Sequence, residues 1–410
     1  MKRIHLSYAD WSRAEYASAF FSLTRGEVAD GAHISRLAER LSELHAPSIA
    51  YPINFGHSAI LIALRAFASR MPERDEVIVP AYICPSVINT VRRAGFKVRF
   101  ADIGNDLNID PASVAVTLNE RTLAVIVPHM YGSPARITEI DALCQSTGVF
   151  MIDDAAQVTG VEHAGRLLGT CGDIGILSFA QSKTVVTGVR GSGGALLVNN
   201  RELDKNISSA CRDLPPARKR GTAFLHFLWN YMWKRYTGTS GYYFARVHDV
   251  LRLETREADC PTRIGNLDAG IALAQLNRLP TIQKRKIRIA EMYCEELKKL
   301  PQVRFPQYAP QRYLTRVMLL LPPGFCAELV RASLQKAGVE TRPGYPMTVS
   351  RGCNAADAAD IAKRLIEVPS GPDISAIDVR RICAALSDSL RSHSPVGELH
   401  HETYQAPYQG

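Results

Sequence analysis

The sequence predicts an α/β fold: a mostly parallel, doubly wound sheet covered by helices on both faces, with a smaller α+β domain after it. Three observations favour this fold. Short apolar runs rich in valine and isoleucine alternate with amphipathic helical patterns along the first half of the chain. The runs are apolar at successive positions, as in strands buried between two helical layers. With 410 residues, the chain exceeds what one compact core accommodates, so two domains are expected.

The individual elements follow from periodicity. Apolar positions recur at helical spacing in residues 34–45 and again from Ser58 onward. Strand-like runs follow at EVIVPAY, FKVRFADI, LAVIVPHMYG, GVFMIDDAA and GGALLVNN, and the helix-like segments between them are SVINTVRRAG and ARITEIDALCQSTG. From about Leu273 to Leu300 the pattern predicts one extended helix with a kink at Pro280.

These elements divide the chain into two domains and a tail. Residues 1–285 are expected to form the large domain. Residues 286–395 are expected to form the small domain, whose apolar patterns include RYLTRVMLLLP and CAELVRASLQKAG. The polar residues 396–410 are expected to form a loose tail, and no internal repeat is present.

The composition is that of an ordinary globular protein, with 46% hydrophobic and 22% charged residues. The formal net charge is +9, but the basic residues are scattered. Neither a zinc-finger spacing nor an RNA-binding signature accompanies them, so nucleic acid is not the predicted partner. A basic protein also suits phosphorylated or nucleotide-linked substrates, because fixed positive charge raises the local concentration of anions.

The cysteines and the N-terminus indicate the compartment. The nine cysteines are odd in number and none has C-x-x-C spacing, which favours free thiols in a reducing compartment over disulfides or a metal site. The N-terminus has no apolar stretch before its first acid, Asp10. No run reaches the roughly eighteen apolar residues needed to span a bilayer. We therefore expect a cytoplasmic protein without a metal site.

One segment stands apart. Residues 212–236 place a cluster of basic residues on each side of an aromatic stretch. One interpretation is an interfacial helix that touches an anionic membrane or a lipid-linked substrate. The other, which we favour from the sequence, is an inserted helix pair packed on the body of the protein or at a dimer contact, because aromatic stripes at helical spacing are more often buried.

The strand GVFMIDDAAQ ends in two acids, Asp153 and Asp154. The carboxyl edge of a parallel sheet is where ligands bind in this architecture, and a buried carboxylate there needs a cationic partner. A protonated pyridine nitrogen meets that need, and it is what makes pyridoxal phosphate an electron sink. The alternative is that one of the two acids caps a following helix.

About thirty residues later, GDIGILSFAQSKTVVTGVRGSGG places Ser178 and Lys183 after another apolar strand. A lysine that binds a cofactor covalently needs burial, which lowers its pKa, and a backbone that admits the cofactor. The Ser178 hydroxyl is suited to donate to a phosphate. Glycines that permit a tight connection follow at 188, 191, 193 and 194. The alternative is a solvated surface lysine beside a plain hairpin.

Near the start of the large domain, NFGHSAILIAL places Gly56, His57 and Ser58 in a turn that opens a helix. Free backbone amides at a helix N-terminus form an anion site, so this turn is a candidate phosphate cradle. An ordinary helix capped by Ser58 is the alternative interpretation.

In these motifs the sequence resembles the DegT/DnrJ/EryC1/StrS sugar aminotransferases, which belong to fold type I of the pyridoxal-phosphate enzymes. The resemblance runs from roughly Ile4 to Leu390, with a divergent insertion at about 205–258. The matching pieces keep the family order, and DDAAQ and GDIG-x-x-SF-x-x-x-K are the most specific of them. The resemblance implies a large cofactor-binding domain, a small domain that closes over the substrate, and a homodimer.

The resemblance also implies roles for single residues. Lys183 would bind the cofactor covalently and shuttle the proton, Asp154 would bind the pyridine nitrogen, and Gln157 would lie beside the ring. The implied phosphate-binding positions are Ser178, Gly56 and His57. The implied substrate-pocket positions are His129, Tyr131, Arg263 and Tyr345.

Some positions depart from the family pattern. The family's aromatic ring that stacks on the cofactor is replaced by Cys84, so the ring face must be covered differently. The family asparagine that reaches the neighbouring subunit's phosphate is replaced by Pro261, which has no N–H donor. The usual Ser-Gly-Thr turn is Phe55-Gly56-His57, and the loop after Lys183 is longer.

The expected function is transfer of an amino group from an amino acid, glutamate first, to a keto group on a nucleotide-linked sugar in glycan or natural-product biosynthesis. One alternative is sugar dehydration on the same site, but the relatives that dehydrate carry histidine where this chain has Lys183. The other is a non-catalytic protein that binds pyridoxal phosphate and acts in regulation or assembly. The motifs leave open the acceptor, the donor and the position and stereochemistry of the new amine.

Overall fold

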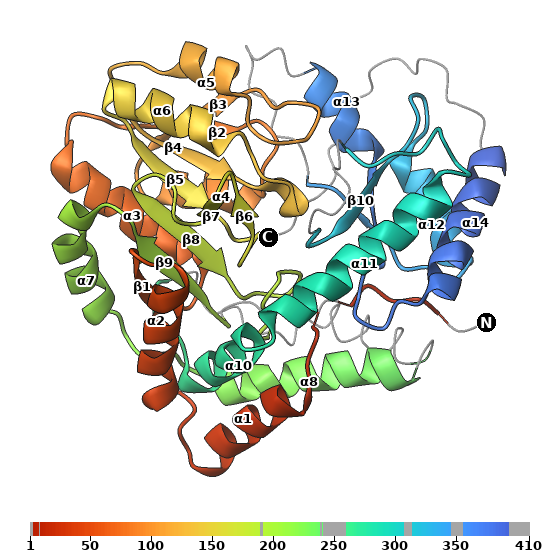
Figure 1. Cartoon of the computed structure of the whole chain (residues 1–410), viewed down its shortest axis with the longest axis horizontal. Coiled ribbons are helices and arrows are strands. Elements are labelled where there is room, and N and C mark those ends of the chain that lie inside the picture. Colours follow the sequence, from red (N-terminus) through yellow and green to blue (C-terminus); the bar gives the residue numbers. More distant parts are fainter. Residues whose placement is uncertain are drawn as a thin grey trace.

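The computed structural model describes residues 3–7, 9–188, 192–237, 240, 260–306, 314–345 and 356–392. In this part of the chain a seven-stranded sheet has the order β1-β9-β8-β5-β4-β2-β3 (Figure 1). Its strands are β1 (Ile49–Ile53), β2 (Glu76–Pro80), β3 (Lys97–Ala101), β4 (Thr122–Pro128), β5 (Phe150–Asp154), β8 (Ile174–Ser178) and β9 (Gly194–Val198). Strands β8, β5, β4, β2 and β3 pair in parallel, and β9 is antiparallel to both of its neighbours. The predicted mostly parallel sheet is confirmed.

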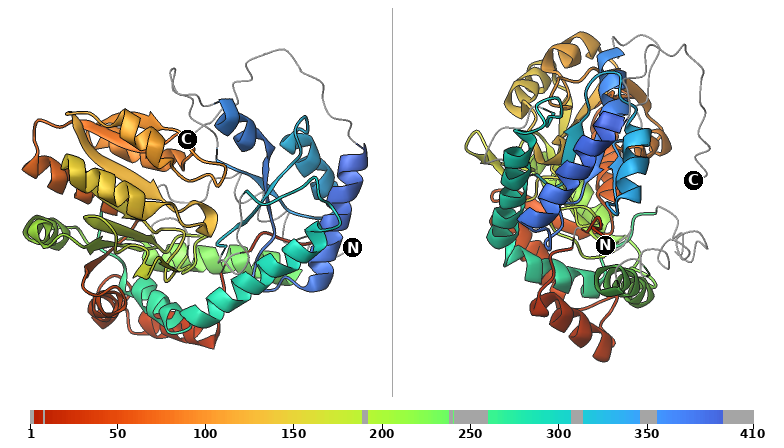
Figure 2. Two further views of the ribbon diagram at one scale, coloured as in Figure 1. Left: turned by 45° about the horizontal axis from the view of Figure 1, so that its top comes forward. Right: turned by 90° about the vertical axis from the view of Figure 1, so that its right-hand side faces the viewer.

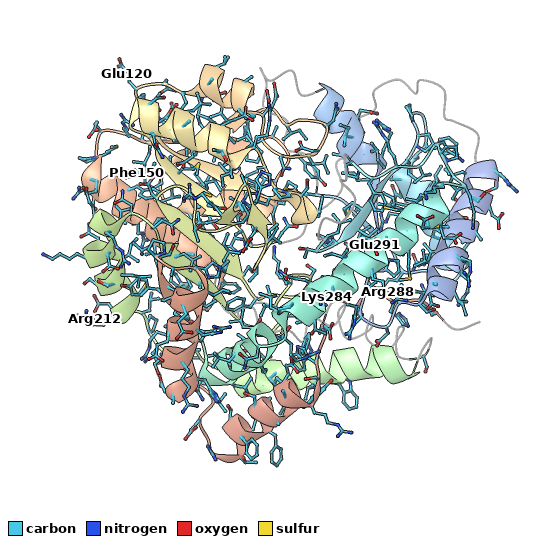
Figure 3. The ribbon with its side chains drawn as sticks, viewed as in Figure 1. Glu120, Phe150, Arg212, Lys284, Arg288 and Glu291 are labelled. Atoms are coloured by element: carbon cyan, nitrogen blue, oxygen red, sulfur yellow. The ribbon has the colours of Figure 1, made fainter. Side chains whose placement is uncertain are left out.

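Helices cover both faces of this sheet, as the doubly wound prediction requires. The helices on one face are α3 (Gly56–Arg70), α4 (Pro85–Arg93) and α7 (Asp204–Arg212). Those on the other are α2 (Ala32–Leu44), α5 (Pro111–Thr117), α6 (Ile137–Thr147) and α10 (Asn266–Leu276). Successive side chains of a strand point to opposite faces of the sheet. Met151 of β5 therefore packs on the face that α6 covers, and Ile152 packs on the face that α3 covers. Phe150, labelled in Figure 3, stacks on Phe67 of α3 with ring centroids 4.2 Å apart.

The C-terminal part forms a second layer of sheet and helices. Its strands have the order β10-β12-β11. Its elements are β10 (Val317–Leu320), α12 (Ala327–Lys336), β11 (Arg342–Pro343), α13 (Ala356–Arg364), β12 (Leu365–Val368) and α14 (Ala376–Ser392). Helix α11 (Leu279–Leu297) runs from the large sheet to this layer (Figures 1 and 2). The N-terminal segment returns here too, because Ile4 pairs with Val339 and packs in the same core.

The single long helix expected at residues 273–300 is a wrong prediction. The structure has two helices, α10 ending at Leu276 and α11 beginning at Leu279. Pro280 lies in the first turn of α11, where its missing N–H costs no hydrogen bond and its fixed φ suits the helix. The proline therefore starts a helix instead of kinking one.

The remaining elements lie outside the two sheets and their helices. They are α1 (Arg13–Thr24), the 3₁₀ turns Met130–Gly132 and Arg201–Leu203, the hairpin strands β6 (Glu162–His163) and β7 (Arg166–Leu167), and α8 (Arg220–Thr237). Helices α1 and α8 lie side by side below the large sheet in the view of Figure 1. Among the described residues, no helix combines the length and apolarity that crossing a membrane requires.

The glycine of the GDIG motif has a steric cause. A Cβ at Gly175 would lie 1.8 Å from the carbonyl oxygen of Gly169. Gly169 itself has φ +97°, in the region that favours glycine. The turn before β8 can therefore cross the strand at van der Waals distance only because position 175 has no side chain.

We predict that Gly175→Ala lowers the free energy of unfolding by about 3 kcal/mol or more, because the added methyl overlaps backbone that cannot move aside cheaply. Urea unfolding followed by circular dichroism measures the change. Gly221→Ala is the matched control, since a Cβ there meets Leu23 Cδ2 at an ordinary 3.5 Å. Equal stability of the two variants would contradict the steric argument.

Candidate active site

The sequence-predicted residues gather at the carboxyl edge of the sheet. Parallel strands end at the same edge, so β8 brings Ser178, β5 brings Asp154 and β4 leads into His129. The next strand, β2, leads into Tyr82, which the sequence analysis did not select. Its position just after a parallel strand was the signal that could have identified it.

Asp153 is a structural anchor. The carboxylate is fully buried, and its Oδ2 accepts hydrogen bonds from the amides of Gly169 at 2.7 Å and Cys171 at 3.1 Å. Its Oδ1 lies 2.8 Å from His129 Nε2. The His129 Nδ1 accepts from the Ala135 amide at 2.9 Å, which places the ring proton on Nε2, facing Asp153. Both nitrogens of His129 are thus engaged, and its geometry suits positioning of the β4 loop.

Asp154 points to the opposite face of β5, because neighbouring strand residues alternate. It is nearly buried, and its Oδ1 accepts from the Ala156 amide at 3.1 Å. That bond closes a turn, and no helix follows, so the helix-cap alternative is wrong for Asp154. Burial raises the pKa of Asp154, and the positive charge of Lys183 opposes the rise. The carboxylate therefore has the setting in which a cationic ring nitrogen would be stabilised.

Lys183 lies in the connection that follows β8. The preceding residue, Ser182, has φ +70°, a left-handed conformation that is uncommon outside glycine. Burial lowers the pKa of the Lys183 ammonium, while Asp154 and Cys84 act to raise it and Arg316 to lower it further. The amine is thus surrounded by charged or ionisable groups from three separate parts of the chain.

Gln157 carries an open hydrogen-bonding atom. Its side chain is almost buried, and Oε1 has no hydrogen-bond partner among the described residues. Its backbone carbonyl accepts from the hydroxyl of Thr315, which fixes the segment in place. A buried amide left open is costly unless a ligand satisfies it. The ring oxygen of pyridoxal phosphate is such a ligand, so Gln157 fits the predicted cofactor.

The candidate phosphate cradle forms where α3 begins. The N-cap is Phe55, without a side-chain cap, so the alternative of a Ser58 cap is wrong; Ser58 instead donates to Asn54 at 2.9 Å. A Cβ at Gly56 would lie 3.5 Å from the Cβ of Ser178. The start of α3 and the Ser178 side chain therefore lie next to each other, and free amides at a helix N-terminus can bind phosphate.

A short hydrogen-bond chain joins this cradle to the Cys84 position. Cys84 is the N-cap of α4, and its Sγ lies 2.8 Å from Ser86 Oγ. The same Ser86 Oγ lies 2.7 Å from His57 Nε2. Where the family has a stacking ring, this chain has a thiol held by a serine and a histidine.

Three tyrosines form a cluster beside the site. The Tyr82 hydroxyl lies 2.6 Å from that of Tyr131 and accepts from the Tyr345 amide at 2.9 Å. The rings of Tyr131 and Tyr345 stack at 5.7 Å. Arg316 lies over both rings, at 5.4 Å and 5.7 Å, and pairs with buried Glu367. The sequence analysis found Tyr131 and Tyr345 and missed Arg316, which lies just before β10 and reaches the site only through the tertiary fold.

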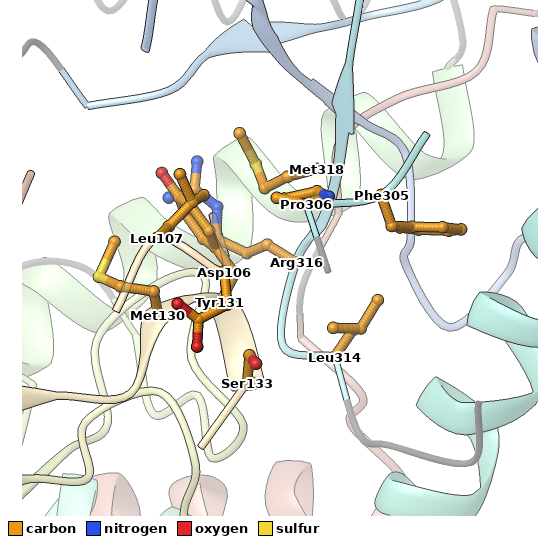
Figure 4. Close-up of a pocket in the computed structure, with 10 residues that line it drawn as sticks. All are labelled: Asp106, Leu107, Met130, Tyr131, Ser133, Phe305, Pro306, Leu314, Arg316 and Met318. Carbon is orange, nitrogen blue, oxygen red and sulfur yellow. The ribbon is translucent and has the colours of Figure 1, made fainter. Parts of the chain in front are cut away.

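Figure 4 shows residues that line a small pocket, which opens between the two domains beside this cluster. Leu107 and Tyr131 line it from loops of the large domain, and Arg316 and Met318 line it from the segment of β10. Both Leu107, at φ +68°, and Tyr131, at φ +54°, adopt the left-handed conformation. Strain of this kind gathers at ligand sites, where the surrounding structure enforces it.

Arg263 lies on a different side of the cradle. Its guanidinium is 3.3 Å from Asp30, and its segment is attached to Asn54, whose side chain contacts Cys260 and Thr262 on either side of Pro261. Among the described residues, none of its contacts joins it to the tyrosine cluster. Its assignment to the substrate pocket stays a prediction.

Solved structures share this fold. PseC of Helicobacter pylori, an aminotransferase involved in the biosynthesis of pseudoaminic acid, superimposes with a TM-score of 0.78 at 19% identity, covering 96% of this chain and 100% of that one. GDP-4-keto-6-deoxy-D-mannose-3-dehydratase of E. coli, with bound hydrated PLP, has a TM-score of 0.73 at 18% identity, covering 94% and 100%. The architecture is therefore fold type I of the pyridoxal-phosphate enzymes.

The chain belongs to the DegT/DnrJ/EryC1/StrS aminotransferase family, whose sequence profile matches residues 13–387. A relative, GDP-perosamine synthase of Escherichia coli O157:H7, is 27% identical over 365 residues, which cover 87% of this chain and 90% of that protein. The family makes the protein an enzyme of the aminotransferase class with pyridoxal 5′-phosphate as its cofactor.

We predict that the Lys183 amine of the cofactor-free protein loses its proton at lower pH than an exposed lysine, because burial disfavours the charged form. Asp154→Asn should lower the midpoint further, since it removes a charge that stabilises the ammonium. Competitive acetylation across pH, read by mass spectrometry, measures the midpoint, with exposed Lys205 as the internal control. A Lys183 midpoint equal to that of Lys205, or a rise in Asp154→Asn, would contradict the assigned environment.

Proposed function

We propose that the protein transfers an amino group from an amino acid, glutamate first, to a keto group on a nucleotide-linked sugar. The observation that carries the proposal is the pairing of Lys183, whose pKa is lowered, with buried Asp154 at the carboxyl edge of the sheet. When bound, pyridoxal phosphate supplies an electron sink that stabilises negative charge on the carbon that loses a proton.

The site residues have separate roles in this proposal. Asp154 holds a positive charge on the ring nitrogen, and Gln157 binds beside the ring. Ser178 and the amides of Gly56 and His57 hold the phosphate. Lys183 would take the proton from the carbon that bears the amino group and return it to the cofactor carbon on the other side of the amino nitrogen. Its lowered pKa leaves more of the amine unprotonated at neutral pH, and the unprotonated amine is the form that accepts a proton.

The name of the relative from E. coli supports a nucleotide-linked sugar as the acceptor. The net charge of +9 agrees with an anionic substrate. We assign the pocket beside Tyr131 and Arg316 to part of this acceptor, because it opens between the domains at the edge of the cofactor site. We also propose a homodimer, as the family resemblance implies, in which Pro261 cannot supply the usual donor to the partner's phosphate.

Dehydration on the same site is the first rival function. The E. coli dehydratase shares the fold, so the fold does not exclude this reaction. Position 183 argues against it, because the resemblance associates dehydration with histidine there. A protein that binds the cofactor without catalysis is the second rival. Retention of both Lys183 and Asp154 argues against that rival, since binding alone does not need a proton shuttle.

The test is the absorption spectrum of the purified protein before and after L-glutamate is added. We expect the band of the lysine-bound cofactor to give way to that of the aminated cofactor. Lys183→Ala should slow this conversion by at least about a thousandfold. Lys205→Ala, an exposed lysine, is the control and should convert at the normal rate.

Each outcome has one meaning. A cofactor band that ignores glutamate and other amino donors would favour the binding-only rival. Normal conversion by Lys183→Ala would overturn the role of that lysine. Conversion with glutamate followed by loss of a hydroxyl group from a keto sugar, without amine transfer, would favour dehydration.

A further inference from the structure

Helix α8 and the residues before it have an unusual charge pattern. Residues 214–237 contain five basic residues and no aspartate or glutamate. Two of the three tryptophans of the chain, Trp229 and Trp233, lie in this segment. The candidate active site uses none of these residues, so the pattern needs another explanation.

One face of α8 is explained by packing. Phe224 and Phe227 are buried and lie against Trp11, with ring centroids 6.0 Å and 5.2 Å from it. Arg220 is buried as well and makes a bidentate ion pair with Asp268 at 2.7 Å and 3.0 Å. This face confirms the interpretation that the insertion packs on the body of the protein.

The opposite face of α8 is apolar and exposed. Leu225 is 56% exposed and Trp229 is 49% exposed, one helical turn apart. A helix that serves only as a packing element would carry polar residues at these positions.

Helix α1 extends this exposed face. Phe20 is 60% and Phe21 is 52% exposed, and the guanidinium of Arg25 lies 5.6 Å from the centre of the Phe21 ring. The two helices meet where Leu23 approaches Gly221. In the described part of the chain, four of the seven exposed large hydrophobic residues belong to α1 and α8. The exposed apolar surface is therefore concentrated here.

Basic side chains border these apolar residues. Arg218 and Lys219 are exposed at the start of α8, and Arg25 is exposed at the end of α1. Among the acids of the loop after α1, Asp30 is paired with Arg263 and Glu27 is exposed. The surface thus combines aromatic and aliphatic side chains with an excess of positive charge, the combination that anionic lipid surfaces bind.

We propose that this α1–α8 face, consisting of Phe20, Phe21, Arg25, Arg218, Lys219, Leu225 and Trp229, docks on the surface of an anionic phospholipid bilayer. The helices lie along the interface with their apolar side chains at the depth of the headgroups, where tryptophan is favoured. A second copy of the chain is the less suitable occupant. In a symmetric dimer each copy would contribute this net-positive face, so like charges would gather at the interface.

The test measures co-sedimentation of the cofactor-loaded full chain with vesicles of phosphatidylcholine and phosphatidylglycerol at 7:3, and with vesicles of phosphatidylcholine alone. We expect binding to the anionic vesicles that weakens as salt is raised, because salt screens exposed charges over about 10 Å at 0.1 M. Trp fluorescence should shift to shorter wavelength on binding. Arg218→Glu/Lys219→Glu should reduce the partition coefficient at least about tenfold, as should Leu225→Ser/Trp229→Ser.

Matched controls change similar residues elsewhere. Ile377→Ser removes an apolar residue that is 63% exposed on α14, and Arg92→Glu reverses an exposed charge on α4. Both should bind vesicles like the unmodified protein. Equal loss of binding in the controls, or equal binding to both vesicle types, would overturn the proposal.

Light scattering on the same variants measures their oligomeric state, which tests whether a second copy of the chain occupies this face instead. If the protein ignores both vesicle types and Leu225→Ser/Trp229→Ser converts a dimer to monomers, the face is an interface between copies and the proposal is wrong. The outcome is independent of the proposed transamination, because all the substituted residues lie outside the candidate active site.

Discussion

The buried carboxylate of Asp153 is the constraint on which the candidate site depends. It fixes two separate parts of the chain against β5: the turn before β8 through the Gly169 and Cys171 amides, and the loop after β4 through His129. An unpaired carboxylate in this position would be very costly, so all of its hydrogen bonds must form together. The glycine at 175 is part of the same constraint, since it admits the turn that carries two of the amides.

Asp154 can serve a ligand because Asp153 serves the fold. The two acids are neighbours in sequence, but the alternation of a strand sends one into the protein interior and the other to the site. Thr315 lies where the second domain meets the first. The Thr315 amide donates to the Tyr131 carbonyl at 3.0 Å, and the Thr315 hydroxyl donates to the Gln157 carbonyl. The Thr315 carbonyl accepts from the Lys286 ammonium at 3.2 Å. The entry to the second domain is therefore attached to both site loops.

The two faces of helix α8 have different surroundings. Its inner face is held by aromatic packing and one buried ion pair, and its outer face carries the exposed side chains of Leu225 and Trp229. The sequence left two interpretations of this segment open, packing and interfacial contact. The packed face is observed, and the lipid-facing role of the other rests on exposure and charge.

The sequence by itself determined the sheet, its helical layers, and the strand ends that carry Asp154, Ser178 and the β4 loop. These features are local, because periodicity and apolar runs depend on residues that are neighbours along the chain. Only the tertiary structure decided that Asp153 holds His129 in place, and that Tyr82 and Arg316 join Tyr131 and Tyr345. It also decided that Pro280 begins a helix. Such choices depend on which distant segments pack together, and no spacing within a single segment contains that information.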